Sequence, residues 1–407
     1  MIVDLHAHYP MHLVAKLRGS PIDVITTARG RRRLRDVIRA WLVGLASRFA
    51  NYRSFGSGPR VTIKSMQDGG VGVAWSVLYS FFDEVDLGTP YGAPPEADYI
   101  DNLIAQLDLV EEDISTNHGG SAAVVHNPAE LDATMAAGKV ALVHVVEGGF
   151  HLGPSPEAVD EAVTKLARRG VAYVVLAHLF YRQVATNANA LPFLKDHLYN
   201  WFFPQPDQGL TELGRAAVRA MVREHVLVDM SHMGDRSVAD TLALLDELDP
   251  QRQVPAFASH AGFRFGKQEY MYSEDTVRAV AARDGLIGLI FAQHQLLDGL
   301  RRSTKSFDQS FEAICAHIDK IASIAGSYRN IGLGTDFDGF IKPTLAGLES
   351  SSDLARLETA LRARYGDETV EAITSANALR LLRTYWRGAS EPLTGWRESP
   401  VRPRPPR

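Results

Sequence analysis

The sequence of 407 residues predicts an α/β fold, and within that class a (β/α)8 TIM-type barrel. Eight short apolar runs recur along the chain, and amphipathic segments separate them. Several of the runs are continuous stretches of Val, Ile and Leu, which is typical of strands buried on both faces of a parallel sheet. A doubly wound open sheet is the alternative, but no Gly-x-Gly-x-x-Gly motif follows the first run to support it.

The predicted strands, in chain order, are residues 2–8, 71–79, 140–147, 171–178, 226–232, 254–260, 286–291 and 331–336. Apolar residues recur at helical spacing in the predicted helices, which are residues 156–168, 213–224, 235–248, 273–283 and 306–325. Gly138, Gly170 and Gly285 precede strands, as expected where the chain leaves a helix.

Two stretches interrupt this alternation, and we interpret them as insertions after strands 1 and 4. Residues 18–60 contain the basic run Arg29-Gly30-Arg31-Arg32-Arg33 and a predicted helix over 36–49. This insertion is either an acid-binding patch or active-site cover or, as we favour, a solvated charged segment. Residues 186–208 are rich in Asn, Pro and aromatic side chains, and either border an active site or pack as an ordinary loop. The predicted organisation is one barrel domain over 1–390 and a Pro/Arg-rich tail over 391–407.

The composition excludes several classes of protein. With 43 Lys and Arg against 48 Asp and Glu, the net charge of −5 opposes docking on nucleic acid or an anionic membrane. No apolar run approaches the ~20 residues that span a bilayer, and the chain begins without a leader-like segment, so we expect a cytoplasmic protein. Because Cys315 is the single cysteine, a disulfide within the chain and a Cys-rich zinc module are excluded. Any metal must be held by carboxylates and by some of the 14 histidines.

Histidines and acidic residues gather at the carboxyl ends of the predicted strands, where barrel enzymes place their active sites. His6 and His8 end the first strand and point to the same face because they are two residues apart. The other members of this set are Glu147, His232, His260 and Asp336. One such residue alone would usually be a hydrogen-bonded core residue or a helix cap. Six of them at five strand ends favour an active site.

Imidazole and carboxylate ligands suit zinc, and also iron, manganese or nickel. Four histidines and one bridging Glu would complete a pair of divalent ions, each with an open position for water. Such a pair generates hydroxide at neutral pH and polarises a carbonyl or phosphoryl oxygen. Asp336 would then be free to act as general base and acid.

The order and wording of these motifs resemble the renal (membrane) dipeptidase family of metal-dependent hydrolases, which have amidohydrolase-type barrels. The resemblance extends from about residue 2 to about residue 385. It rests on Asp4-Leu5-His6-Ala7-His8, Gly72-Val73-Ala74-Trp75-Ser76-Val77, Val146-Glu147-Gly148-Gly149, Val228-Asp229-Met230-Ser231-His232, Ala258-Ser259-His260, Gly332-Leu333-Gly334-Thr335-Asp336-Phe337-Asp338-Gly339 and Ala376-Asn377-Ala378-Leu379-Arg380.

The resemblance implies a role for each site residue. Glu147 would bridge two zinc ions, with His6 and His8 on the first ion and His232 and His260 on the second. Asp336 would handle the proton. His178, in Leu176-Ala177-His178, would be both a catalytic residue and a substrate contact, assisting the substrate carbonyl or the tetrahedral intermediate.

Two departures from the family pattern concern the charge of the site. His8 stands where the family usually has Asp, so the metal pair should be more positive, or one ion should be held more weakly. Tyr270 or Met271 stands at the family's carboxylate-clamping Arg, and neither replaces a guanidinium. Arg264 or Lys267 could stand in from the same loop, and Arg264 is our predicted substrate contact.

The predicted function is a binuclear metal-dependent hydrolase that cleaves a peptide bond of a small substrate with metal-bound hydroxide as nucleophile. One alternative is an amidohydrolase for a non-dipeptide amide, lactam or ester, and the other is a non-catalytic metal-binding scaffold. The expected cofactors are two divalent ions, most readily zinc. The expected partners are a peptide-like small molecule and a second copy in a homodimer, with neither nucleic acid nor membrane.

Overall fold

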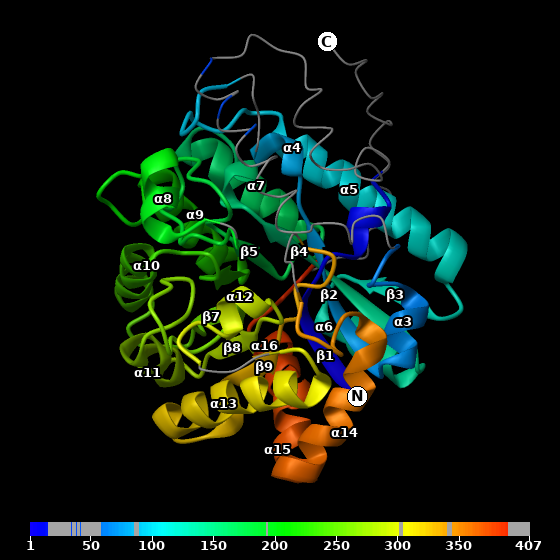
Figure 1. Cartoon of the computed structure of the whole chain (residues 1–407). Coiled ribbons are helices and arrows are strands. Elements are labelled where there is room, and N and C mark those ends of the chain that lie inside the picture. The colour runs from blue at the N-terminus through cyan, green and yellow to red at the C-terminus, as the bar shows by residue number, and fades with distance from the viewer. Residues whose placement is uncertain are drawn as a thin grey trace.

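The computed structural model describes residues 1–14, 34, 38, 41, 58–84, 89–192, 194–300, 304–339 and 344–389. Parallel strands in these residues form one sheet of order β2-β1-β9-β8-β7-β6-β5-β4-β3, and β2 also pairs with β4. All strands except β3 therefore close into an eight-stranded barrel (Figure 1). The strands are β1 (Ile2–Ala7), β2 (Val71–Leu78), β3 (Ala122–Val125), β4 (Val140–Glu147), β5 (Tyr173–Val175), β6 (Leu227–Asp229), β7 (Phe257–Ala261), β8 (Leu286–Leu289) and β9 (Ile331–Leu333).

The predicted barrel is confirmed, and each of the eight predicted runs coincides with one barrel strand, although β7 extends one residue beyond its run. Strand β3 is the one that sequence reasoning missed. It pairs with the first half of β4, from Val140 to Val143. The end of β4 pairs with β5 on that same side of the strand. Because β3 lies outside the ring, its two central residues are only partly buried and the segment lacks a continuous buried pattern.

Helices surround the barrel (Figure 1). They are α3 (Ile63–Asp68), α4 (Phe81–Glu84), α5 (Tyr99–Asp113), α6 (Pro128–Ala136), α7 (Pro156–Arg168), α8 (Asp196–Phe202), α9 (Glu212–Glu224), α10 (Asp235–Leu248), α11 (Glu274–Ala282), α12 (Gln293–Leu296), α13 (Phe307–Ala325), α14 (Leu354–Tyr365), α15 (Asp367–Glu371) and α16 (Asn377–Thr384). The five predicted helices agree with α7, α9, α10, α11 and α13 to within one residue at each end.

Side-chain caps explain why these helices begin where they do. Ser155, Thr211, Ser273 and Ser306 each accept a hydrogen bond from a backbone N–H in the first turn of α7, α9, α11 and α13. Each cap satisfies a donor that the helix itself cannot, which is typically worth about 1 kcal/mol.

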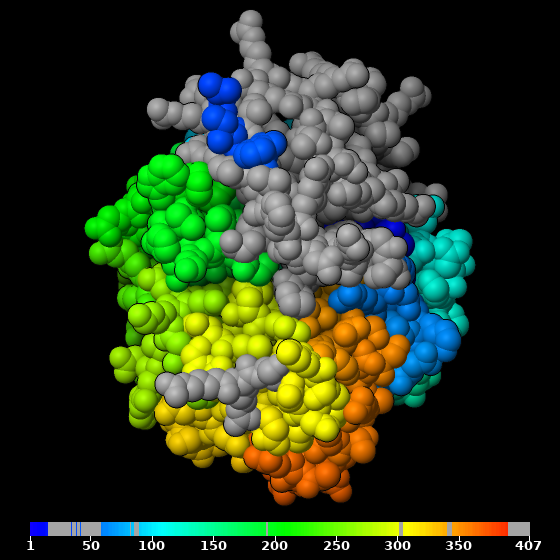
Figure 2. All heavy atoms as spheres, viewed as in Figure 1, coloured from blue at the N-terminus to red at the C-terminus, as the bar shows by residue number. Residues whose placement is uncertain are grey.

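Figure 2 shows α13 beside α14 on one side of the molecule, where Arg364 pairs with Glu312 at 3.3 Å.

Three aromatic side chains, Trp75, Tyr173 and Phe257, fill the barrel interior. They come from β2, β5 and β7, and their ring centroids lie 5.3–5.4 Å apart. All three are fully buried. Large aromatic rings in offset contact contribute both buried apolar area and a favourable ring geometry.

The insertion after β1 is described only in part. The basic run at 29–33 and most of the predicted helix over 36–49 lie outside the described residues, as does the predicted tail over 391–407. Both stems of the insertion meet one carboxylate in the loop after β9. Asp338 Oδ2 accepts hydrogen bonds from the backbone N–H groups of Arg60 at 2.8 Å and Val61 at 2.9 Å, and it lies 3.0 Å from His12 Nε2.

The stretch predicted as a second insertion follows β5 and contains α8. Tyr199 of α8 is fully buried, and its hydroxyl donates to the carbonyl oxygen of Leu179 at 2.6 Å. This bond ties the helix to the loop that leaves β5. Within the described part of the chain, no helix is long and apolar enough to cross a membrane.

Candidate metal centre

The carboxylate of Glu147, at the end of β4, is surrounded by four imidazoles. Its Oε1 lies 3.2 Å from Nε2 of His6, 3.4 Å from Nε2 of His232 and 3.6 Å from Nε2 of His260. Its Oε2 lies 3.5 Å from Nε2 of His8. None of the five side chains is more than 5% exposed. The structure thus brings together all five residues that the sequence predicted as metal ligands.

Asp336 and His178, the two predicted catalytic residues, border this group. Asp336 Oδ1 lies 3.0 Å from His8 Nε2 and 3.7 Å from His6 Nε2. His178 Nε2 lies 3.3 Å from Glu147 Oε2. The two side chains come from the loops after β9 and β5, so both extend from the carboxyl ends of barrel strands.

Three sets of side chains have ligand atoms close enough to hold an ion, with all atoms of a set within 4.8 Å of one another. The sets are His6, Glu147 and His260; His6, His8 and Asp336; and Glu147, His178 and His232. Imidazole nitrogen with carboxylate oxygen is a donor combination that suits zinc. The buried Oε1 of Glu147 has no hydrogen-bond partner among the described residues, as expected of an oxygen that faces a cation. The residues therefore fit divalent ions.

Hydrogen bonds behind two of the rings fix which nitrogen faces the centre. The Tyr173 hydroxyl donates to the carbonyl oxygen of Leu5 at 3.0 Å, so its oxygen accepts from Nδ1–H of His6 at 2.7 Å. Nδ1 of His260 is paired in the same way with Ser259 Oγ at 2.7 Å. With Nδ1 occupied, the Nε2 atoms are left to bind a metal, which is the usual outer-sphere arrangement of metal-binding histidines.

Two buried aspartates hold the strand ends together. Asp4 accepts hydrogen bonds from the backbone N–H groups of His6 at 3.2 Å and Thr335 at 3.0 Å, and from the Thr335 hydroxyl at 2.6 Å. Asp229 accepts from the backbone N–H groups of Ser231 at 2.8 Å and Ser259 at 3.1 Å. Burial raises the pKa of Asp4 to about 6 and also raises the pKa of Asp229. Each aspartate thus joins two neighbouring strand ends that carry site residues.

The backbone at the site has left-handed conformations. Gly148 follows Glu147 with φ +97°, and a Cβ there would lie 2.3 Å from the Phe150 ring. Glycine is therefore required directly after the central carboxylate. His232 and Asp336 have φ values of 64° and 56°, which residues with side chains rarely adopt. Such strain persists where the surrounding structure enforces it, and functional sites are where it concentrates.

The electrostatics of the group favour an ionised Glu147, a neutral His260 and a protonated His178. Burial alone would raise the pKa of Glu147, but attraction by His178 and His6 outweighs it and holds the pKa well below its usual range. Burial, and repulsion by His6 and His232, lower the pKa of His260 well below its usual range. Burial opposes protonation of His178, yet Glu147 and Glu84 raise its pKa to about 9. Ionised carboxylate and neutral imidazole are the forms that bind cations.

The loop after β7 presents a phenol, not a cation, to the site. The Tyr270 hydroxyl lies 3.3 Å from His232 Nε2 and is almost fully buried. Met271 points elsewhere and packs against Gly262. The guanidinium of Arg264 binds both carboxylate oxygens of Asp235, at 2.8 and 2.5 Å, and its Nε donates to the carbonyl oxygen of Met271 at 2.7 Å. Substrate binding by Arg264 therefore stays a prediction that requires the guanidinium to leave Asp235.

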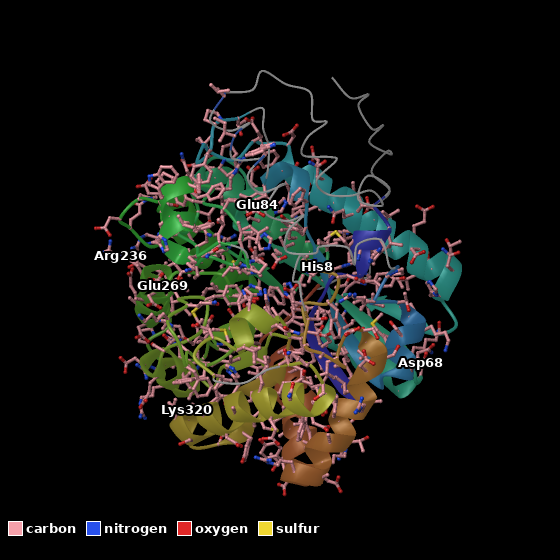
Figure 3. The ribbon with its side chains drawn as sticks, in the orientation of Figure 1. His8, Asp68, Glu84, Arg236, Glu269 and Lys320 are labelled. Atoms are coloured by element: carbon pink, nitrogen blue, oxygen red, sulfur yellow. The ribbon has the colours of Figure 1, made fainter. Side chains whose placement is uncertain are left out.

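Sequence reasoning missed Glu84, which follows β2 and contacts His178 Nδ1 at 2.6 Å. No motif marks it, and its one signal is its place after the carboxyl end of a strand. His8 and Glu84 lie inside the outline of the molecule, whereas Asp68 and Arg236 lie at its edge (Figure 3).

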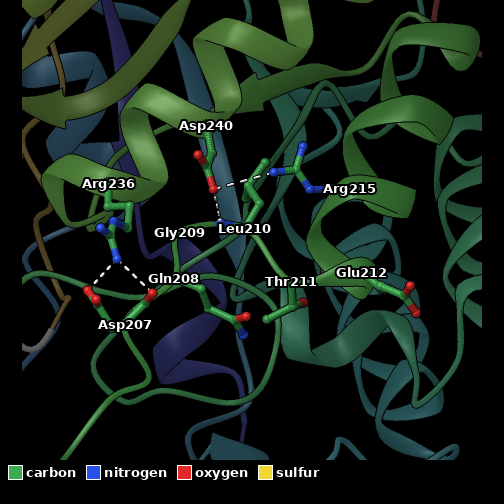
Figure 4. Close-up of a pocket in the computed structure, with 9 residues that line it drawn as sticks. All are labelled: Asp207, Gln208, Gly209, Leu210, Thr211, Glu212, Arg215, Arg236 and Asp240. Atoms are coloured by element: carbon green, nitrogen blue, oxygen red, sulfur yellow. Dashed lines mark hydrogen bonds and ion pairs between the residues drawn. The ribbon is translucent and has the colours of Figure 1, made fainter.

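A surface hollow of about 540 Å³ lies apart from the ligand group, between the residues before α9 and the start of α10 (Figure 4). Four of its charged side chains form two ion pairs: Arg236 with Asp207, and Arg215 with Asp240 at 3.5 Å. None of the predicted site residues lines it. Glu147 and the imidazoles around it therefore remain the candidate site.

Comparison with known proteins bears on the same site. The membrane dipeptidase family, peptidase family M19, matches residues 2–390. An uncharacterized dipeptidase of Schizosaccharomyces pombe is 26% identical over 246 residues, or 60% of this chain and 53% of that protein. Dipeptidase verJ of Clonostachys rogersoniana is 23% identical over 279 residues, or 68% of this chain and 63% of that protein. These alignments thus span less than two thirds of either relative.

A solved structure has the same fold. It is a metallo peptidase from Rhodobacter sphaeroides liganded with a phosphinate mimic of the dipeptide L-Ala-D-Ala, and it matches with a TM-score of 0.67 and 19% identity over 95% of this chain and 99% of that chain. Because the family match extends over nearly the whole sequence, the chain belongs to the membrane dipeptidase family, peptidase family M19.

Proposed function

We propose that the chain is a binuclear metal-dependent dipeptidase. The observation that carries this proposal is the convergence of four imidazole Nε2 atoms on the Glu147 carboxylate. Each of these atoms lies within 3.6 Å of Oε1 or Oε2. Membership in the M19 family supports it. So does the dipeptide mimic bound to the Rhodobacter sphaeroides metallo peptidase of the same fold.

In the proposed arrangement two zinc ions would be held by Glu147 together with His6 and His8 for one ion and His232 and His260 for the other. The ions would acidify a water molecule and polarise the scissile carbonyl, which is chemistry that the side chains alone do not supply. The walls of the group are buried, which limits the water around the reacting atoms.

Two residues of the chain act on the substrate in this proposal. Asp336 takes a proton from the attacking water and delivers it to the leaving amine, because its carboxylate lies against His8 and His6 at the edge of the group. His178 supports the substrate carbonyl oxygen from the opposite loop, with Nε2 facing the centre.

The test is hydrolysis of a dipeptide panel by the zinc-loaded enzyme, followed as release of free amino acids. We expect turnover by the wild type and a loss of at least 100-fold in kcat for Asp336→Asn, with both ions still bound. Absence of turnover for every dipeptide, by protein that holds two ions, would contradict the proposal.

A specific observation keeps the alternative of a non-dipeptide amide, lactam or ester open. The loop that the resemblance assigns to carboxylate binding places the Tyr270 hydroxyl beside His232, and the Arg264 guanidinium in that loop is already paired with Asp235. Hydrolysis of dipeptide amides in preference to free dipeptides would favour this alternative. A scaffold without catalysis needs neither Asp336 nor His178, so we rank it last.

A cytoplasmic location and a homodimer stay predictions. Cell fractionation tests the first, and light scattering behind a sizing column tests the second.

A further inference from the structure

Glu84, at the end of α4, is a buried acid with an unusual set of partners. Its Oε2 accepts hydrogen bonds from the Tyr79 hydroxyl at 2.6 Å and from Nδ1–H of His178 at 2.6 Å. Its Oε1 accepts from the backbone N–H of Phe180 at 2.9 Å. The side chain is fully buried, and no Lys or Arg among the described residues pairs with it.

A buried carboxylate without a cationic side chain is costly, because ionised groups lose far more solvation than neutral ones. Neutral groups could satisfy the donors of Tyr79 and Phe180. The contact that calls for a carboxylate is the one with His178 Nδ1, which is short and charge-assisted. Burial raises the pKa of Glu84, but attraction by His178 and the bonds from Tyr79 and Phe180 prevail and lower it.

The bonds of Glu84 determine how the His178 ring lies. Since Nδ1 donates to Glu84, Nε2 must face the opposite way, where it lies 3.3 Å from Glu147 Oε2. The ring is also held edge-on by Tyr79, at 4.7 Å between centroids, and by His232, at 4.5 Å. The bond to Phe180 fixes the backbone two residues beyond His178. One carboxylate from the loop after β2 thus controls both the ring and the main chain of the loop after β5.

We propose that Glu84 is a positioning residue that fixes the direction of the His178 ring, so that Nε2 faces the carbonyl oxygen of the substrate. This inference rests on the proposed function. A competing role follows from the third ligand set, in which His178 binds an ion together with Glu147 and His232. An outer carboxylate that orients a metal-binding histidine would look similar, so the test must separate the two roles.

The kinetic test compares Glu84→Gln, His178→Gln and the double variant in the zinc-loaded enzyme. We expect Glu84→Gln to lower kcat by about 10- to 100-fold, with KM changed less than about threefold and both ions retained at unchanged affinity. In the double variant kcat should equal that of His178→Gln alone, because Glu84 acts through His178. Tyr79→Phe is the matched control: it removes one bond to the same oxygen, leaves the His178 bond in place and should keep at least a third of kcat.

A spectroscopic arm needs no substrate and so separates failure of this inference from failure of the proposed function. In metal-free protein with ¹⁵N-labelled histidine, His178 is assigned by its absence in His178→Gln. We expect a strongly hydrogen-bonded, downfield-shifted Nδ1–H proton of His178 in the wild type and an upfield shift of that proton in Glu84→Gln. His151, whose Nδ1 donates to the Gly148 carbonyl oxygen at 2.8 Å, is the internal control and should not change.

Three results would overturn the proposal. They are an unprotonated Nδ1 of His178 in the wild type, independent effects of Glu84→Gln and His178→Gln on kcat, and a tenfold or greater loss of metal affinity in Glu84→Gln. The last of these would assign His178 to the metal instead.

Discussion

Replacing His232 by Ala should remove half of the stabilisation that metal gives to the folded chain. The substitution deletes an imidazole whose Nε2 lies 3.4 Å from Glu147 Oε1 and 2.9 Å from His260 Nε2. The second proposed ion then keeps only Glu147 and His260 as ligands. The first ion, proposed at His6 and His8, keeps all of its ligands. We therefore expect His232→Ala to bind one ion where the wild type binds two.

The size of the effect follows from linkage. An ion that binds only the folded state, present at 1,000 times its Kd, stabilises that state by about 4 kcal/mol, so two ions contribute about 8 kcal/mol. An unfolding entropy of about 2.1 cal/mol/K per residue gives about 0.85 kcal/mol/K for 407 residues. The Tm of the wild type should then rise by about 10 °C on zinc loading, and that of His232→Ala by about 5 °C.

The assay is thermal unfolding in chelator and in buffered zinc, with bound metal measured by elemental analysis. His144→Ala is the matched control, because His144 is a fully buried histidine of β4 that belongs to none of the three ligand sets. It should lower Tm in both buffers but keep the full rise on zinc loading. The reasoning is refuted if the wild type gains nothing from zinc, or if the two variants keep the same rise.

Three further outcomes are expected. Burial lowers the pKa of His317 to about 4, so between that value and the unfolded value near 6.5 the unfolded chain binds more protons. His317 should therefore contribute about 2 kcal/mol to the fall in stability from pH 8 to 5 in urea titrations, and His317→Gln should remove that contribution. Arg264→Gln should raise KM for free dipeptides but not for dipeptide amides. The comparison variant is Arg182→Gln, because Arg182 is a buried arginine that donates a hydrogen bond to the Tyr99 hydroxyl. Equal KM values for Arg264→Gln and the wild type would exclude the Arg264 contact. His8→Asp should keep two ions and move the acidic limb of the rate profile to higher pH, since the site becomes less positive; an unchanged profile would contradict this account.

The barrel and the ligand group could be predicted from the sequence because both leave local signals. A strand buried on both faces is a continuous apolar run, and a candidate ligand at its carboxyl end follows that run directly, as Glu147 follows 140–146. Strand β3 escaped notice because four residues outside the ring need no such run.

The partners of the ligands could not be predicted, because barrel closure alone brings them together. Glu84 and His178 are 94 residues apart, and Asp4 and Thr335 are 331 apart. Nothing in either local sequence points to the other. The position of Tyr270 against His232 depends in the same way on how the loop after β7 folds back over its own strand.

The single carboxylate of Asp338 holds both stems of the first insertion, and so brings the two ends of that segment together. His12, Arg60 and Val61 meet at this one point, so the cost of closing the segment between them depends mainly on its length. Doubling the length of such a loop costs only about 0.6 kcal/mol of closure entropy. Loops of other lengths, grafted between these anchor residues, should therefore be tolerated at little cost in stability.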